Sequence, residues 1–333
     1  MYQAIHGFED HLKAELSPFV LANELASASD LASADEFDKT SGTEDCIEPI
    51  AGSLYHVSGS APVDAASAAI YWYQNCWLEP FQLEFSSINE AASVLRGIQR
   101  NWSACLHTHY RRGALISAKL PPISAKPRPF PWLVGDSPVG AWTLLDAHTM
   151  IASAHCSSPF PGGVIEFAQD KEGPPSRAYL KLWEALVRLR RWPSAGDFCI
   201  DAGASPGGWT WALAQLGARV CAIDRAPLED RIAALPGVEY VRHDAFTLKP
   251  RDIGPVDWLF CDAACYPPRL YEWIAAWLES GLCRNFVCTI KMQGIVNAGA
   301  VDFTTPRRFA EIPGSAVVHL YHNKHELTWM MLE

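Results

Sequence analysis

The chain has 333 residues, a net charge of −10 and 49% apolar residues. This length predicts two domains, because domains most often contain about 100 to 150 residues. No run approaches the roughly 18 apolar residues of a membrane span, and the first residues lack a signal-peptide pattern, so we expect a cytoplasmic protein without membrane partners. The acidic balance argues against a protein that coats nucleic acid through charge alone.

The ten cysteines include no Cys-x-x-Cys pair, and several lie inside apolar runs such as 198–200 and 220–222. This pattern is typical of buried, reduced thiols in a cytosolic protein. It does not favour zinc ligands or disulfides, so we expect no metal site.

Charge is distributed unevenly along the N-terminal half. Residues 20–45 are acidic and favour a solvated, partly disordered helix or loop. Residues 91–135 contain no Asp or Glu, and they carry seven cations: Arg96, Arg100, Arg111, Arg112, Lys119, Lys126 and Arg128. Four aromatic residues are interleaved: Trp102, Tyr110, Phe130 and Trp132. Such a surface suits RNA, although an ordinary solvated basic face would have the same composition.

Apolar patterning predicts an α+β region in this half. The expected elements are a strand at 81–85, a helix at 89–101, a strand at 114–118 and a hairpin at 141–145 and 149–154. The first three would form a βαβ unit that carries the basic residues. Proline-rich residues 119–131 favour an extended connector or groove-lining segment.

From residue 177 onward, helices and strands alternate. We expect helices at 178–189, from Trp209, and at 269–280, and strands at 198–201, 219–224, 238–241, 256–261, 285–291, 316–322 and 326–332. This alternation predicts a mostly parallel, doubly wound α/β sheet. The domain boundary falls near 165–175, which divides the chain into regions 1–165 and 166–333.

The stretch DAGASPGGW, residues 201–209, links the first of these strands to a helix. In open α/β sheets the ligand lies beyond the carboxyl ends of the strands, and Gly203, Gly207 and Gly208 would let it approach the backbone. The spacing matches neither a dinucleotide-binding turn nor a P-loop, which favours a smaller, cationic nucleoside.

Further acids stand at the following strand ends. Asp224 could accept both hydroxyls of a ribose, and Asp244 could accept from an adenine amino group. Together with Asp201 and the glycine turn, they favour S-adenosylmethionine as the ligand.

Residues 201–209 resemble the first motif of the FtsJ-like RNA 2′-O-methyltransferases, and residues 175–182 are similar to the segment that precedes it. The resemblance is strongest to the bacterial members that modify a cytidine of 23S ribosomal RNA and carry an N-terminal THUMP-type region. Residues 6–12 and 157–161 resemble the N-terminal domain and the domain junction of these members more weakly. The resemblance implies a Rossmann-like, S-adenosylmethionine-dependent domain after an α+β RNA-binding region. The implied donor-binding residues are Ser176, Asp201, Gly203, Ser205, Pro206, Gly207, Gly208, Trp209, Asp224, Asp244 and Asp262.

That family uses a Lys-Asp-Lys-Glu tetrad, and the sequence matches it at Lys181, Asp262, Lys291 and Glu326. A ribose hydroxyl is a poor nucleophile, so its attack on a sulfonium methyl group needs an aligned base. We assign this role to Lys291, whose neutral form must be made accessible by burial or a neighbouring cation. Lys181 would supply that cation and hold the hydroxyl. Asp262 would orient Lys291, and Glu326 would position Lys181 or the ribose.

Two other functions stay open. Tyr266, Pro267 and Pro268 superficially resemble, in reversed order, an element of amino-group methyltransferases. A methyltransferase for base nitrogens or small molecules is therefore one alternative. The other is an RNA-binding protein that keeps a donor pocket without turnover, although an intact tetrad argues against it.

Overall fold

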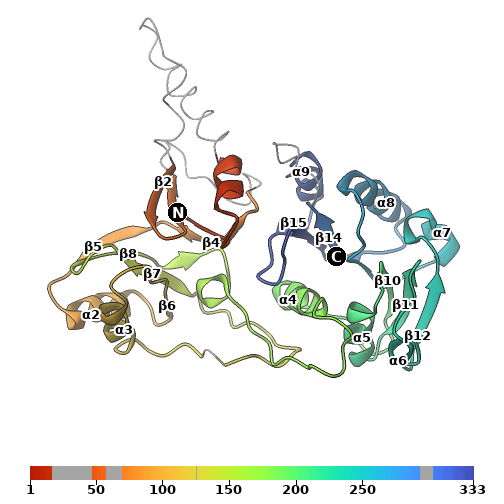
Figure 1. The fold of residues 1–333 in the computed structure, drawn as a ribbon, viewed down its shortest axis with the longest axis horizontal. Helices are drawn as coiled ribbons and strands as arrows, with labels where there is room; N and C mark the ends of the chain where they lie inside the picture. The colour runs from red at the N-terminus through yellow and green to blue at the C-terminus, as the bar shows by residue number, and fades with distance from the viewer. Residues whose placement is uncertain (17–46, 58–69, 125, 293–302) are drawn as a thin grey trace, which may run out of the picture. The chain divides into compact units, whose positions relative to one another are not determined.

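The computed structural model describes residues 1–16, 47–57, 70–124, 126–292 and 303–333. The chain divides into two compact units, each described here by itself (Figure 1). Unit 1 holds residues 1–126 and 135–165, and unit 2 holds residues 127–134 and 166–333. The acidic segment 20–45 lies outside the described residues. Within the described ranges, no helix is both long enough and apolar enough to cross a membrane.

The described residues of unit 1 form two sheets. An antiparallel sheet of order β2-β3-β1-β4-β9 is formed by β1 (Tyr2–Ala4), β2 (Ile47–Ala51), β3 (Leu54–Val57), β4 (Tyr73–Leu78) and β9 (His155–Cys156). A second sheet of order β5-β8-β7-β6 is formed by β5 (Phe81–Glu84), β6 (Trp102–Ala104), β7 (Gly140–Leu144) and β8 (Thr149–Ser153). Strands β7 and β8 form the expected hairpin.

The predicted βαβ unit has a different second strand. Helix α2 (Ile88–Ile98) begins after Ser87, whose side chain accepts a hydrogen bond from the backbone of Glu90. The chain then forms β6, which pairs in parallel with β7. The prediction of a strand at 114–118 was wrong, because these residues lie in or directly after helix α3 (Tyr110–Ser117). A short apolar run does not distinguish a strand from a helix that buries one face.

The core of unit 1 holds α2 and α3 against the four-stranded sheet. Leu95 of α2 and Ile116 of α3 pack in one cluster with Trp142 and Met150 of the hairpin, and all four side chains are fully buried. Each helix therefore uses one face for packing and exposes the other. The basic residues of the two helices are carried largely on the exposed faces.

Unit 2 is built on a seven-stranded sheet of order β12-β11-β10-β13-β14-β16-β15. Its strands are β10 (Phe198–Ala202), β11 (Arg219–Asp224), β12 (Val238–Arg242), β13 (Trp258–Cys261), β14 (Asn285–Lys291), β15 (Ser315–Val318) and β16 (Glu326–Met331). Strands β10 to β14 are parallel, and β16 is antiparallel to both of its neighbours. This sheet confirms the predicted α/β class.

Helix α4 (Tyr179–Leu189) precedes the first strand of this sheet. The helices between the strands are α5 (Gly208–Gln215), α6 (Asp230–Ala233), α7 (Pro250–Ile253), α8 (Pro267–Ser280) and α9 (Thr304–Ala310). Two 3-10 turns are η1 (Pro161–Gly163) in unit 1 and η2 (Ala245–Thr247) in unit 2. In the sheet, β10 lies between β11 and β13, so the strand order reverses there. Open α/β sheets bind their ligands beyond the carboxyl ends of the strands at such a reversal.

The proline-rich segment is divided between the units. Its second half belongs to unit 2, where the backbone of Arg128 bridges to Phe167 in parallel. Phe130 stacks on Trp183 of α4, with ring centroids 4.8 Å apart and planes 11° apart. This half of the segment is therefore part of the packing around α4.

Candidate active site

The turn after β10 packs closely against the rest of unit 2. Gly203 has a φ of 78°, and a Cβ there would lie 2.5 Å from the Cα of Ala263. A Cβ on Gly207 would lie 2.7 Å from a side-chain carbon of α6, and one on Gly208 would lie 2.5 Å from the Oγ of Ser176. Protein atoms thus lie beside the Cα atoms of all three glycines, so a side chain at any of these positions would clash. The approach of a ligand to this backbone stays a prediction.

Asp201 lies under this turn and is fully buried. Its Oδ2 accepts a hydrogen bond from the Thr210 hydroxyl at 2.6 Å, while its Oδ1 has no partner among the described residues. Burial raises the pKa of this carboxyl to about 7, and the Thr210 bond offsets only part of that effect. A buried oxygen without a partner is costly, which makes Oδ1 a candidate contact for a ligand.

Asp224 ends β11 and holds the turn. Its Oδ2 accepts from the backbone N–H of Ser205 at 3.0 Å, and its Oδ1 accepts from that of Ala226 at 2.9 Å. Each carboxylate oxygen can accept a further bond, so Asp224 remains able to bind hydroxyl groups. The Ser205 hydroxyl donates to the carbonyl of Pro227 at 2.8 Å, which ties this side of the turn to the segment after β11.

Asp244 follows β12 and is held in two ways. Its Oδ1 accepts from the backbone of Phe246 at 3.1 Å, and its Oδ2 pairs with Arg269 of α8 at 3.0 Å. Burial alone would raise the pKa of Asp244, but the Arg269 and Phe246 bonds outweigh it and the net pKa is lowered. The side chain is therefore an ionised acceptor at neutral pH.

Two of the predicted donor-binding residues support the turn from within the protein. Trp209 is buried, and its Nε1 donates to the carbonyl of Ala178 at 2.9 Å, which ties α5 to the residue before α4. The carbonyl of Pro206 accepts from the backbone of Glu229 at 3.1 Å. Both residues fix the shape of the site without presenting a polar side-chain atom to it.

Four ionisable side chains meet at the carboxyl ends of β13 and β14. Asp262 directly follows β13, Lys291 ends β14, Glu326 begins β16, and Lys181 lies in the first turn of α4. Because β14 and β16 are antiparallel with Lys291 opposite Glu326, the first residue of β16 lies at the last residue of β14. The fold thus brings together residues that are up to 145 positions apart.

Asp262 lies between the two lysines. The Nζ of Lys181 donates to Oδ2 at 2.7 Å and to Oδ1 at 3.0 Å, and the Nζ of Lys291 donates to Oδ1 at 2.5 Å. Glu326 forms an ion pair with Lys181, at 3.1 Å. The Lys291 side chain is 22% exposed, against 11% for Lys181, so Lys291 is the more accessible amine.

Charge pairing decides the protonation of two members of this cluster. Burial alone would lower the pKa of Lys181, but Asp262 and Glu326 outweigh it and raise the pKa. Burial alone would raise the pKa of Asp262, but Lys291 and Lys181 outweigh it and lower the pKa. Lys181 is therefore held as an ammonium and Asp262 as a carboxylate, which excludes Lys181 as a base near neutral pH.

Thr289 also belongs to this site and was missed by the sequence reasoning. Its side chain is fully buried, and its hydroxyl donates to Oδ1 of Asp262 at 2.7 Å. It lies two residues before Lys291, so both side chains leave β14 on the same face. That period of two was the signal that could have identified it.

The seven predicted RNA-binding cations are divided between the units. Six belong to unit 1, whereas Arg128 belongs to unit 2, where its guanidinium lies 4.8 Å from the ring centroid of Trp132. Arg112 is half-buried over the ring of Phe85 at 5.4 Å. The remaining five cations are exposed: Arg96, Arg100, Arg111, Lys119 and Lys126.

The aromatic residues interleaved with these cations also differ in how exposed they are. Trp102 is buried, and its Nε1 donates to the carbonyl of Leu95 at 2.8 Å. Phe130 stacks on Trp183 in unit 2. Tyr110 is strongly exposed, with 64% of its surface accessible. The expectation that Trp102 belongs to an exposed aromatic surface was therefore wrong, because this ring is buried.

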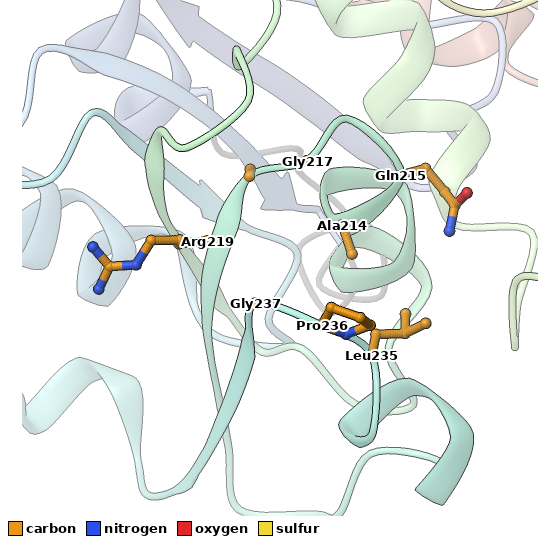
Figure 2. Close-up of a pocket in the computed structure, with 8 residues that line it drawn as sticks. Ala214, Gln215, Gly217, Arg219, Leu235, Pro236 and Gly237 are labelled. Carbon is orange, nitrogen blue, oxygen red and sulfur yellow. The ribbon is translucent and has the colours of Figure 1, made fainter.

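A separate cavity of about 340 Å³ lies near the start of β11 (Figure 2). Its lining includes Gln215, Arg219, Leu235 and Pro236. Figure 2 shows the side chains of Arg219 and Gln215 directed away from each other, so these polar groups do not converge. The tetrad lies at the carboxyl ends of the parallel strands, whereas this cavity lies at the opposite end of β11.

Comparisons with known proteins identify the family. A family model described as FtsJ-like methyltransferase matches residues 174–296. Ribosomal RNA large subunit methyltransferase M of Xanthomonas euvesicatoria pv. vesicatoria (strain 85-10) is 33% identical over 251 residues, which are 72% of this chain and 68% of that protein. The protein of the same name from Azoarcus sp. (strain BH72) is 36% identical over 182 residues, 51% of this chain and 49% of its own length.

The chain thus spans about half the length of the Azoarcus relative. Among solved structures, the Methanococcus jannaschii fibrillarin pre-rRNA processing protein is 19% identical, with a TM-score of 0.34 over 46% of this chain and 74% of that chain. The family model indicates S-adenosylmethionine as the methyl donor. The chain belongs to the family of ribosomal RNA large subunit methyltransferase M proteins and carries an FtsJ-like methyltransferase domain.

Proposed function

We propose that this chain transfers a methyl group from S-adenosylmethionine to a ribose 2′-hydroxyl of RNA, and that the RNA is ribosomal. The observation that carries the proposal is the carboxylate of Asp262, which holds two lysines at the ligand-binding edge of the sheet. The family match supports methyl transfer, and the name of the relatives supports ribosomal RNA as the substrate.

The acids at the strand ends fit the methyl donor chemically. Asp224 would accept hydrogen bonds from the ribose hydroxyls, and Asp244 would accept one from the adenine amino group. The buried Oδ1 of Asp201, which has no partner among the described residues, could accept a further hydrogen bond from the donor. The bound donor would supply an electrophilic methyl group on a cationic sulfur. The carboxylate of Asp262, kept ionised by the lysines, suits the neighbourhood of that positive charge.

Within the tetrad we assign the base to Lys291. Lys181 contacts two carboxylates and is held as an ammonium, whereas Lys291 contacts Asp262 and is more exposed. In its neutral form, the Nζ of Lys291 would take the proton of the 2′-hydroxyl as that oxygen attacks. The ammonium of Lys181 would hold the same hydroxyl oxygen, and Glu326 would keep Lys181 in place.

For the other region we propose RNA binding. Region 1–165 would be a THUMP-like RNA-binding domain, and region 166–333 would be the methyltransferase domain. The exposed cations of α2 and α3 support this, because solvent-exposed Lys and Arg can neutralise phosphates. We further propose that the protein acts in the cytoplasm, where bacterial ribosomes are assembled.

The structure around Tyr266 disfavours the alternative of an amino-group methyltransferase. Tyr266 precedes α8, and the two prolines that follow form the first turn of that helix. Proline is favoured there because the first helical N–H groups need no partner within the helix. The Tyr-Pro-Pro sequence is thus explained as the start of a helix.

The product of the reaction tests the proposal. Labelled S-adenosylmethionine is incubated with the protein and total RNA from cells that lack it, and the RNA is then hydrolysed with alkali. We expect the label in an alkali-resistant dinucleotide, because a 2′-O-methyl group blocks cleavage at that position. Label on a base would establish the amino-group alternative, and RNA binding without any transfer would establish the non-catalytic one.

A further inference from the structure

The loop that precedes Glu326 is held by a buried glutamate of α4. Glu184 has no exposed surface, and its Oε1 accepts from the backbone N–H of Tyr321 while its Oε2 accepts from that of His322, each at 3.0 Å. These two residues lie in the connection between β15 and β16. A single carboxylate thus binds two successive backbone groups of a loop that contributes to the site.

The charge of Glu184 is balanced within its own helix. Arg188, one turn later, approaches Oε1 with Nη2 at 2.9 Å and donates to it from Nε at 3.0 Å. A buried carboxylate with several donors is costly to replace, because each donor would lose its partner. This arrangement fixes the carboxylate, and the carboxylate fixes the loop.

The same helix also holds the end of that loop. Lys181 lies one turn before Glu184 and pairs with Glu326, the first residue of β16, at 3.1 Å. Residues three apart on a helix lie on the same face, so α4 contacts the loop at two points on one side. Between them, the carbonyl of His325 accepts from the backbone of Met292 at 2.9 Å, which joins the loop to the end of β14.

We propose that Glu184 is a positioning residue for methyl transfer: by clamping the backbone of Tyr321 and His322, it sets where Glu326 meets Lys181. The inference rests on the proposed function of the tetrad. Glu184 itself touches none of the reacting atoms. Without the clamp, Glu326 shifts from Lys181, and a displacement of about 1 Å in such a cluster can lower a rate by about 100-fold.

The test uses the full-length protein with Glu184→Gln, which keeps the size of the side chain but replaces one accepting oxygen by an NH₂ group. Hydrogen exchange is measured over residues 319–327, and kcat and KM are measured for methyl transfer to RNA. We expect exchange at Tyr321 and His322 to be at least tenfold faster, kcat to fall about tenfold, and KM for S-adenosylmethionine to stay within twofold. Glu184→Ala gives a second, larger perturbation.

The chain offers a matched control in unit 1. Glu15 is also buried, and its Oε2 accepts from the successive backbone groups of Tyr71 and Trp72 at 2.9 and 2.8 Å. Glu15→Gln should lower thermal stability to a comparable extent while leaving exchange at 319–327 and kcat unchanged. This control separates the local clamp from a general loss of stability.

A double variant decides whether Glu184 acts through Glu326. We expect Glu184→Gln with Glu326→Ala to be no more than twofold slower than Glu326→Ala alone, because the clamp has nothing left to position. The inference would be overturned if the double variant lost the product of the two single-variant rate losses. Unchanged hydrogen exchange at 319–327 in Glu184→Gln would overturn it as well. An inactive wild-type protein would refute the proposed function instead, and the exchange data would still decide whether the clamp exists.

Discussion

The tetrad of unit 2 and the helix pair α2–α3 of unit 1 both concentrate charge, but they hold it in opposite ways. Asp262 is almost enclosed and has both lysines within hydrogen-bond distance, so its geometry is fixed by several partners at once. By contrast, Arg111 of α3 is exposed, as are Arg100 and Lys119, which lie just after the two helices. Buried charges with fixed partners suit the alignment of reacting atoms, whereas exposed charges suit salt-dependent contact with phosphates.

This contrast predicts the largest effect for Asp262→Asn. The substitution removes the shared carboxylate and leaves two lysines facing each other, so we expect methyl transfer to fall by about 10²- to 10⁴-fold. The loss of one partner from a buried charge cluster should also cost about 3 kcal/mol of stability. Asp257→Asn, an exposed aspartate at the opposite end of β13, is the matched control for both measurements. Equal activity of the two variants would refute the central role of Asp262.

A second prediction concerns Asp201 and pH. Its folded pKa of about 7 is above the unfolded value, so the protonated form favours folding and this contribution is lost as pH rises from about 4 through 7. By pH 8 the difference approaches about 4 kcal/mol. Asp201→Asn should remove this part of the pH dependence in denaturant titrations between pH 5 and 8. If both proteins show the same slope, Asp201 does not titrate as inferred.

A somewhat smaller effect is expected for Gly203→Ala. The residue has a left-handed backbone, and the added Cβ would meet the backbone of Ala263, so we expect a loss of about 2 kcal/mol or more in the free energy of unfolding. Gly281→Ala is the control, because Gly281 has a φ of 66° and nothing within 4 Å of the added atom. A Gly203 variant no less stable than the Gly281 variant would show that the turn is loosely packed.

The smallest effect is expected for the exposed cations of unit 1. Arg111→Ala with Lys119→Ala should weaken RNA binding only several-fold at moderate salt and reduce the slope of log K against log salt by about 1.4. Binding of S-adenosylmethionine should not change. The control pair Lys171→Ala with Arg251→Ala removes two exposed cations from unit 2. Equal salt slopes for both pairs would show that Arg111 and Lys119 have no special role in RNA binding.

The strands and helices of unit 2 could be predicted from sequence because their signals are local and repeated. Apolar runs such as β14 are bounded by polar ends, and aspartates recur at several of those ends. The resemblance then placed Lys181 and Glu326, whose meeting depends on the antiparallel pairing of β16 with β14. Nothing in the local pattern around Glu326 indicates that pairing.

The errors arose where local patterns have two physical explanations. Residues 114–118 are apolar enough for a strand, yet they pack as a helix because Ile116 meets the core beside Leu95. Trp102 was counted with the basic surface, although it fills the core. Whether such a segment forms a strand or a helix, and whether such a ring is buried, depends on residues that are distant in the sequence.

The central claim is tested most directly by single-turnover methyl transfer to RNA with Lys291→Ala beside Lys171→Ala, both at saturating S-adenosylmethionine. Lys291 ends β14 within the tetrad, whereas Lys171 is an exposed lysine of the same unit. Our account predicts that Lys291→Ala lowers the rate of 2′-O-methylation by at least about 100-fold while Lys171→Ala leaves it unchanged. Undiminished transfer by Lys291→Ala would contradict the assignment of the base and the ribose mechanism built on it.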